Sequence, residues 1–146
     1  MEIQLLVIII IMIACSAFFS ASETALTGAN RIRLKSMAEN GSKGAKMALK
    51  LLDRYDKVIT TILIGNNIVN ITASSLGTIL ATAIVGPDNA ALVSTVVLTL
   101  VILAFGEVMP KSLAKDHSEG LTVATSGIIT FLTFCLLYTS DAADDT

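Results

Sequence analysis

Residues 105–111 read FGEVMPK and follow residues 90–105 (AALVSTVVLTLVILAF), an apolar run without a single charge. Such a run is typical of a membrane-spanning helix, so Glu107 is expected where the helix leaves the hydrocarbon. A carboxylate at that depth is costly unless it pairs with a cation, a donor or water, which makes it a functional candidate. Pro110 has no amide hydrogen, so it is expected to free the carbonyl of Gly106, four residues back. A free carbonyl beside a carboxylate favours cation binding. A helix that simply ends at the interface, with Glu107 solvated, accounts for the same residues.

The composition indicates a membrane protein. Of the 146 residues, 53% are hydrophobic and 15% are charged, with a mean hydropathy of +0.76, far more apolar than a soluble domain. We predict an all-α membrane protein with three transmembrane helices, amphipathic helices beside them and a fourth, short apolar helix. No Ser/His/Asp set, zinc signature or phosphate loop is apparent, so an enzyme is the weakest candidate. The lipid bilayer is the expected partner; nucleic acid is not.

Two further apolar segments, residues 3–22 and 58–85, complete the predicted set of spans. Ser16 and Ser20 are four residues apart, as are Asn66 and Asn70, so each pair stacks on one helix face. Polar groups at this depth need partners. In membrane helices such residues often only bond back to their own carbonyls or hold helices together, and that alternative stays open for both pairs.

The basic residues predict the topology. Residues 30–57 hold eight of the ten Lys and Arg residues and suit two amphipathic helices joined at Asn40-Gly41. By the positive-inside rule this stretch is cytoplasmic, and a solvated surface helix explains it without specific lipid recognition. We therefore expect a multi-pass protein of the cell membrane with its N-terminus outside. Residues 86–89 are then outside and residues 111–120 inside.

The C-terminal part is less clearly defined. Residues 121–138 are apolar but short, so they are compatible with a span, a re-entrant segment or a helix along the interface. The predicted domain covers residues 1–138, and the acidic tail 139–146 lies outside it. Cys15 and Cys135 both fall in apolar segments, which favours buried thiols over a disulfide or a metal site.

The polar residues of the three spans fall in the same, cytoplasmic half of the predicted membrane. Hydroxyls, amide oxygens, a backbone carbonyl and one carboxylate form an all-oxygen set, which suits hard cations such as magnesium, calcium or sodium. With one carboxylate the site would hold its ion weakly, as a transporter that must release the ion requires. The members of this set are Ser16, Ser20, Asn66, Asn70, Gly106 and Glu107.

Three stretches carry a resemblance to a known family: residues 16–25 (SAFFSASETA), 64–70 (IGNNIVN) and 105–111 (FGEVMPK). In order and spacing, over residues 1–137, they resemble the DUF21 transmembrane domain of the CorC and cyclin M (CNNM) magnesium transport proteins. The resemblance implies a homodimer, a cation pocket between three helices, and export of Mg²⁺ in exchange for Na⁺. It places the ion at Ser16, Ser20, Asn66, Gly106 and Glu107, with Asn70 added by position and Pro110 and Lys111 as structural support.

The resemblance has two further implications. Residues 121–138 are expected to form a membrane-associated helix that returns the chain to the cytoplasm. Family members continue into cytoplasmic CBS domains that bind nucleotide, whereas no nucleotide site is expected in this chain. The tail from Tyr138 onward does not resemble the family's linker, as expected of a truncation or a sequencing artefact. The alternative function is therefore a membrane anchor or dimerisation module for such cytoplasmic domains.

Overall fold

The computed structural model describes the backbone of residues 1–144 and the side chains of residues 1–135, and this part of the chain is helical throughout, without strands. The all-α prediction is confirmed. Four helical stretches in the described part are long and apolar enough to cross a membrane: Glu2–Gly28, Tyr55–Val85, Pro87–Asp116 and Ser118–Cys135. The elements in chain order are α1 (Glu2–Gly28), α2 (Arg31–Glu39), α3 (Lys43–Asp53), α4 (Tyr55–Val85), α5 (Pro87–Val101), η1 (Ile102–Val108), α6 (Met109–Asp116) and α7 (Ser118–Asp144).

The helices form two compact units. The first, here called the bundle unit, comprises Met1–Ala21 and Gly65–Ser112. The second, the amphipathic unit, comprises Ser22–Ile64 and the residues from Leu113 onward. Each unit is described by itself below.

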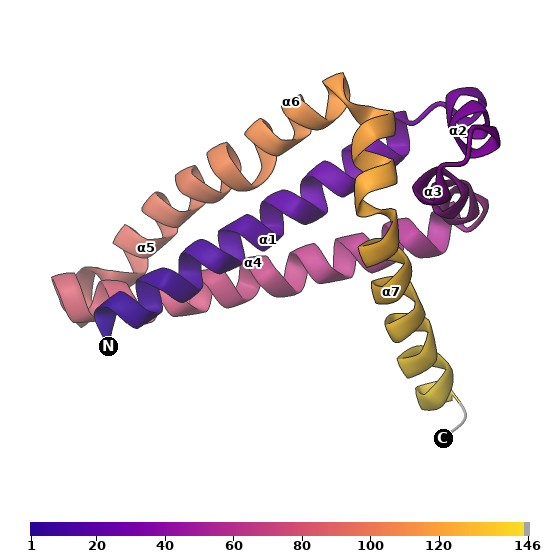
Figure 1. Ribbon diagram of the computed structural model, residues 1–146. Coiled ribbons are helices and arrows are strands. Elements are labelled where there is room, and N and C mark those ends of the chain that lie inside the picture. The colour runs from indigo at the N-terminus through magenta and orange to yellow at the C-terminus, as the bar shows by residue number, and fades with distance from the viewer. Residues whose placement is uncertain (145–146) are drawn as a thin grey trace. The chain divides into compact units, whose positions relative to one another are not determined.

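In the bundle unit, α1 and α4 run antiparallel, as Figure 1 shows. The ring of Phe19 lies against the backbone at Gly65, where an added Cβ would be 2.7 Å from the ring. Thr78 and Ser94 share a hydrogen bond of 3.1 Å that joins α4 to α5. Gly86 has φ +86°, and Pro87 starts α5 at its first turn, where the missing amide hydrogen costs nothing. The expected turn at residues 86–89 is thus confirmed at Gly86-Pro87.

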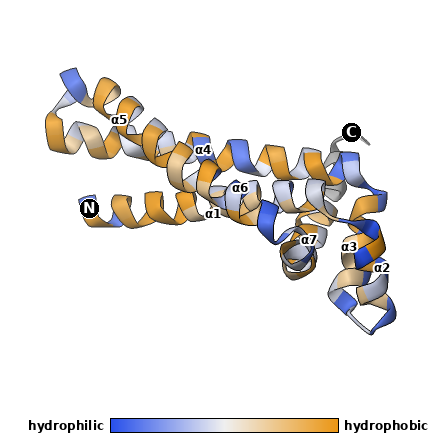
Figure 2. Ribbon diagram, turned by 90° about the horizontal axis from the view of Figure 1, so that it is seen from above, coloured by the Kyte–Doolittle hydropathy of each residue, from blue (hydrophilic) through white to orange (hydrophobic). Residues whose placement is uncertain are grey.

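The outer surface of the bundle unit is apolar. Figure 2 shows mostly hydrophobic ribbon along α1, α4 and α5. Large aliphatic side chains on all three helices are exposed, Ile10, Ile71 and Leu100 among them. A soluble protein rarely exposes so continuous an apolar surface, whereas contact with lipid requires one.

One turn of the bundle unit departs from the α-helix. Residues Ile102–Val108 form a π-helix, η1, in which Met109 N–H donates to the carbonyl of Ala104, five residues back. The predicted release of the Gly106 carbonyl assumed bonds that span four residues. In the wider register of η1 the carbonyl five residues before Pro110 is that of Phe105, so the missing amide hydrogen of the proline concerns the carbonyl of Phe105 as well as that of Gly106.

The amphipathic unit begins with two short, well-capped helices. Asn30 Oδ1 accepts from the amide of Ile32 at 2.9 Å and starts α2. Gly41 has φ +99° and makes the predicted turn, and Ser42 Oγ accepts from Ala45 N at 3.1 Å to start α3. These contacts confirm two helices within residues 30–57.

Helix α3 packs lengthwise on α7. A Cβ at Gly44 would lie 2.6 Å from Cγ1 and 3.0 Å from the carbonyl oxygen of Val123, and Met47 approaches Gly127. The α3 residues Ala45, Ala48, Leu51 and Leu52 are buried. The basic residues stay on the exposed side, so α3 is amphipathic as predicted.

Helix α7 is longer than the segment 121–138 from which it was predicted. It starts at Ser118 and continues through Asp144, so it includes most of the tail 139–146, and Asp145 and Thr146 lie outside the described residues. Cys15 is half-buried and Cys135 is exposed. The expectation of a buried thiol is therefore wrong for Cys135, whose neighbours Phe131 and Phe134 on α7 are also exposed.

Candidate cation site

The candidate site is built on a contact between α1 and α4. Ser16 is fully buried, with 0% of its surface exposed, and its Oγ donates a hydrogen bond of 3.0 Å to Asn66 Oδ1. Fifty residues separate the two in the sequence. The structure thus brings together two of the predicted residues, in agreement with the interhelical hydrogen bonding that the sequence left open as an alternative.

The π-helix η1 contributes a third segment to this contact. A Cβ built on the buried Gly106 would lie 3.1 Å from Ser16 Oγ and 3.5 Å from Ser16 Cβ. A side chain at this position would make a contact tighter than ordinary van der Waals contact, so glycine suits this close approach of the two segments. Ser16, Asn66 and Gly106 therefore meet at one level of the bundle unit.

Ser20 and Asn70 have unsatisfied oxygens. Ser20 is 1% exposed, and neither its Oγ nor the buried Oδ1 of Asn70 has a hydrogen-bond partner among the described residues. A buried polar atom without a partner costs about 1–3 kcal/mol, and few such atoms persist in native proteins without an ion, water or functional role. A bound cation would satisfy both kinds of oxygen.

These oxygens form a row along the helices. Ser20 is one turn, about 6 Å, beyond Ser16 on α1, and Asn70 is one turn beyond Asn66 on α4. Because α1 and α4 run antiparallel, Ser20 and Asn70 lie on opposite sides of the Ser16–Asn66 bond. Ligands of one magnesium ion stand about 2.1 Å from it. The oxygens of Ser20 and Asn70 are therefore too far apart to bind the same ion. They lie beyond the Ser16–Asn66 bond in opposite directions along the helices.

The remaining predicted residues lie in η1 and just after it. Glu107 is half-buried and follows Gly106 directly, Pro110 is buried and Lys111 is half-buried. Within the described residues, no three His, Cys, Asp or Glu side chains are grouped so as to hold a metal. The site therefore offers neutral oxygens and one neighbouring carboxylate. That set fits a weakly held hard cation that keeps part of its water shell, and it does not suit a thiolate-seeking metal.

Two features were missed at the sequence level. The first is the π-helix, a rare structure that is frequent at functional sites; Gly106 and Pro110 inside an apolar helix were its available signal. The second is Ser22, whose Oγ is buried and has no hydrogen-bond partner among the described residues. Ser22 is part of the amphipathic unit, and its place in the SAFFSAS stretch was its signal.

The long apolar helices and their exposed aliphatic surface define a multi-pass, all-α membrane protein. More narrowly, the chain belongs to the cyclin M transmembrane N-terminal domain family, whose sequence model matches residues 7–140. The resemblance to the DUF21 domain is thereby confirmed. A UPF0053 protein of Haemophilus influenzae is 43% identical over 128 residues, 88% of this chain and 30% of that protein. The UPF0053 inner membrane protein YfjD of Escherichia coli is 45% identical over 114 residues, 78% of this chain and 26% of that protein.

A third relative has a name that states an activity. The polyamine export protein of Salmonella typhimurium is 40% identical over 70 residues, which cover 48% of this chain and 16% of that protein. In all three comparisons this chain spans less than a third of the relative's length.

Proposed function

We propose that this chain is the transmembrane part of a cation transporter that exports Mg²⁺, with Na⁺ as the coupling ion. The observation that carries the proposal is the pair of buried, unbonded oxygens, Ser20 Oγ and Asn70 Oδ1, on either side of the Ser16–Asn66 bond. Oxygens left without donors are suited to a ligand that accepts electron pairs, and a hard cation is such a ligand.

The weakness of the site suits transport. Glu107 is the one carboxylate among the proposed ligands, and the others are neutral, so the ion is not held tightly and can leave. A row of oxygens also offers successive positions for an ion that moves along the helices. In this proposal Pro110 and Lys111 support the site, and they do so by fixing the end of η1.

The orientation and assembly are part of the proposal. The basic residues of α2 and α3 favour the cytoplasm for residues 30–57, which leaves the N-terminus outside. Since this chain matches only 30% and 26% of the length of these relatives, we propose that cytoplasmic CBS domains and a homodimer belong to the whole protein. Residues 1–138 are the proposed membrane domain.

The first test is magnesium flux in proteoliposomes under an imposed sodium gradient, with the wild-type chain and the Glu107→Gln and Asn66→Ala variants. We expect flux to fall at least tenfold in both variants, because each removes an oxygen or a charge that holds the ion. Asn67→Ala is the matched control, since Asn67 is the exposed neighbour of Asn66 on α4 and its loss leaves the site intact. Flux that survives in Glu107→Gln contradicts the proposal.

Two alternatives give different outcomes. The name of the Salmonella relative favours a polyamine as a second candidate cargo, since a diamine is also a cation that oxygens can bind. In that case putrescine, and not Mg²⁺, is transported in a Glu107-dependent way. If folded protein transports neither cation, the chain acts as a membrane anchor for the cytoplasmic domains proposed above.

A further inference from the structure

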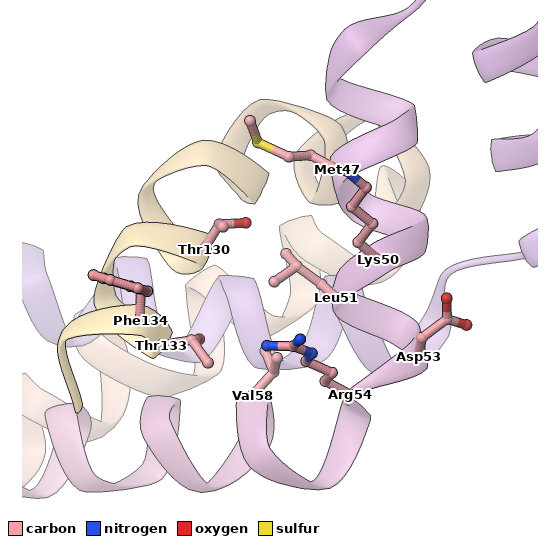
Figure 3. A pocket seen from close by; sticks show the side chains of 9 residues that line it. All are labelled: Met47, Lys50, Leu51, Asp53, Arg54, Val58, Thr130, Thr133 and Phe134. Carbon is pink, nitrogen blue, oxygen red and sulfur yellow. The ribbon is translucent and has the colours of Figure 1, made fainter. Parts of the chain in front are cut away.

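The amphipathic unit contains a cavity of about 420 Å³ between α3, the start of α4 and α7, shown in Figure 3. All of its walls belong to this unit. Basic, hydroxyl and apolar side chains all contribute to its lining, with the basic ones at α3 and the hydroxyls on α7. The lining residues used below are Met47, Lys50, Asp53, Arg54, Thr133 and Phe134.

The positive charges of the cavity are not neutralised by the protein. Within the described residues Lys50 and Arg54 form no ion pair, whereas Asp53 Oδ1 is held by Arg31 Nη1 at 3.0 Å. Figure 3 shows the Arg54 side chain extending toward Thr133 on α7, with Asp53 turned to the other side. Thr133 Oγ1 already donates to the Ile129 carbonyl at 2.8 Å. An anion in the cavity therefore finds its donors in Lys50 and Arg54.

The apolar part of the lining continues into exposed apolar surface. Phe134 is 67% exposed and Met47 39% exposed. On the adjoining turns of α7, Ile128 and Phe131 are also exposed. A small soluble anion would leave this surface in water, whereas an anion that carries hydrocarbon chains would cover it.

The composition of α3 favours a position for the cavity at the depth of lipid headgroups. Helix α3 carries Lys43, Lys46, Lys50 and Asp53, which is typical of a helix at the membrane surface. It packs along α7 from Val123 to Phe134. This packing favours the interface for the same stretch of α7, with its exposed phenylalanines toward the acyl chains.

We propose that this cavity binds the phosphate group of an anionic phospholipid. Lys50 and Arg54 contact the phosphate, and the acyl chains leave the cavity over Met47 and Phe134. Two cations that face the same group favour an anionic headgroup over a neutral one. The lipid would join α3 to α7, and the proposal does not depend on the cation site.

The test is lipid binding to the full chain in detergent, followed by native mass spectrometry with phosphatidylglycerol and phosphatidylcholine. We expect phosphatidylglycerol to bind at least tenfold more tightly than phosphatidylcholine. In the double variant Lys50→Gln/Arg54→Gln the Kd for phosphatidylglycerol is expected to rise about tenfold, so that the preference is lost. Lys43→Gln/Lys46→Gln is the matched control, because it removes the same charge from α3 outside the cavity, and it should keep the preference within about twofold.

The proposal is overturned if the wild-type chain shows no preference for phosphatidylglycerol, or if both double variants lose that preference equally. It is also overturned if inorganic phosphate competes fully with the lipid, because the site would then bind the free anion. Wild-type protein provides a test that does not require a folded variant. Phosphatidylglycerol with a photoreactive group in its acyl chain should crosslink to peptides that contain Met47 or Phe134. Crosslinks confined to the bundle unit contradict the assignment.

Discussion

The two units differ in the hydrogen-bond partners of their buried hydroxyls. In the amphipathic unit the buried hydroxyls bond back to carbonyls of their own helix, as Thr122 does to Ser118 at 2.7 Å and Ser126 to Val123 at 2.8 Å; Ser22, the first residue of that unit, is the exception. In the bundle unit Ser16 bonds across to another helix, and Ser94 bonds both to Thr78 on another helix and to the Ala91 carbonyl of its own. Ser20 has no hydrogen-bond partner in the described part of the chain. A hydroxyl satisfied within its own turn needs no ligand. Burial of a hydroxyl therefore does not by itself indicate a binding site. The lack of a hydrogen-bond partner within its own helix is the more informative sign.

The largest expected effect tests the packing that holds the amphipathic unit together. Gly44→Leu should lower the unfolding free energy by about 3 kcal/mol, because its side chain meets the Val123 carbonyl, which cannot move aside. Unfolding in mixed detergent micelles measures the change. Gly120→Leu on α7 is the control, since nothing lies within 4 Å of its Cβ position. Equal losses in both variants would mean that the α3–α7 contact is not what stabilises this unit.

The second prediction addresses the unbonded hydroxyl. Ser20→Ala should raise the unfolding free energy in the absence of ions by about 1 kcal/mol, because it removes a buried oxygen without a partner. It should also reduce the stabilisation that Mg²⁺ confers. Ser126→Ala, in which the lost hydroxyl has a bond, should bring no gain. A less stable Ser20→Ala protein would show that this oxygen has a partner within the fold.

The third prediction compares the two kinds of hydrogen bond directly. Ser16→Ala should cost about 0.6 kcal/mol, the usual value of an interhelical hydrogen bond in a membrane protein, since Asn66 Oδ1 loses its donor. Thr122→Val should be close to neutral, because its bond lies within one helix. Both are measured by the same unfolding assay. If Thr122→Val costs more, the contrast between the units does not hold.

The smallest effect is expected from the surface charges of the amphipathic unit. Asp53→Asn should change the unfolding free energy by less than about 0.5 kcal/mol, because its ion pair with Arg31 is solvent-exposed. The change should vanish at high salt. A loss that persists at high salt would assign this pair a structural role.

Much of the fold could be predicted from the sequence. The uncharged runs defined the spans, and Asn40-Gly41 and Gly86-Pro87 marked turns that the structure confirms at Gly41 and Gly86. Hydrophobic periodicity does not reveal where a helix ends, so α7 extends beyond the segment expected from residues 121–138. It also gives no hydrogen-bond register, which is why the π-helix was missed.

Less of the candidate site could be predicted. The spacing of Ser16 with Ser20, and of Asn66 with Asn70, correctly suggested that each pair shares a helix face. It did not show which residue of one helix meets which residue of the other, because that depends on how each helix is rotated about its axis. The direct contact of Ser16 with Asn66 and Gly106 comes from the structure.

The π-helix between α5 and α6 has a consequence for how this part of the chain can move. Its bonds are offset by one residue from those of an α-helix, and one residue corresponds to a rotation of about 100° and a rise of about 1.5 Å. Rewinding η1 as an α-helix would turn the residues of the bundle unit that follow it, up to Ser112, while α5 keeps its place. Gly106 lies within η1, so the same change would shift the bare backbone that now faces Ser16. The contact between α1 and this segment thus depends on the hydrogen-bond register of a single turn.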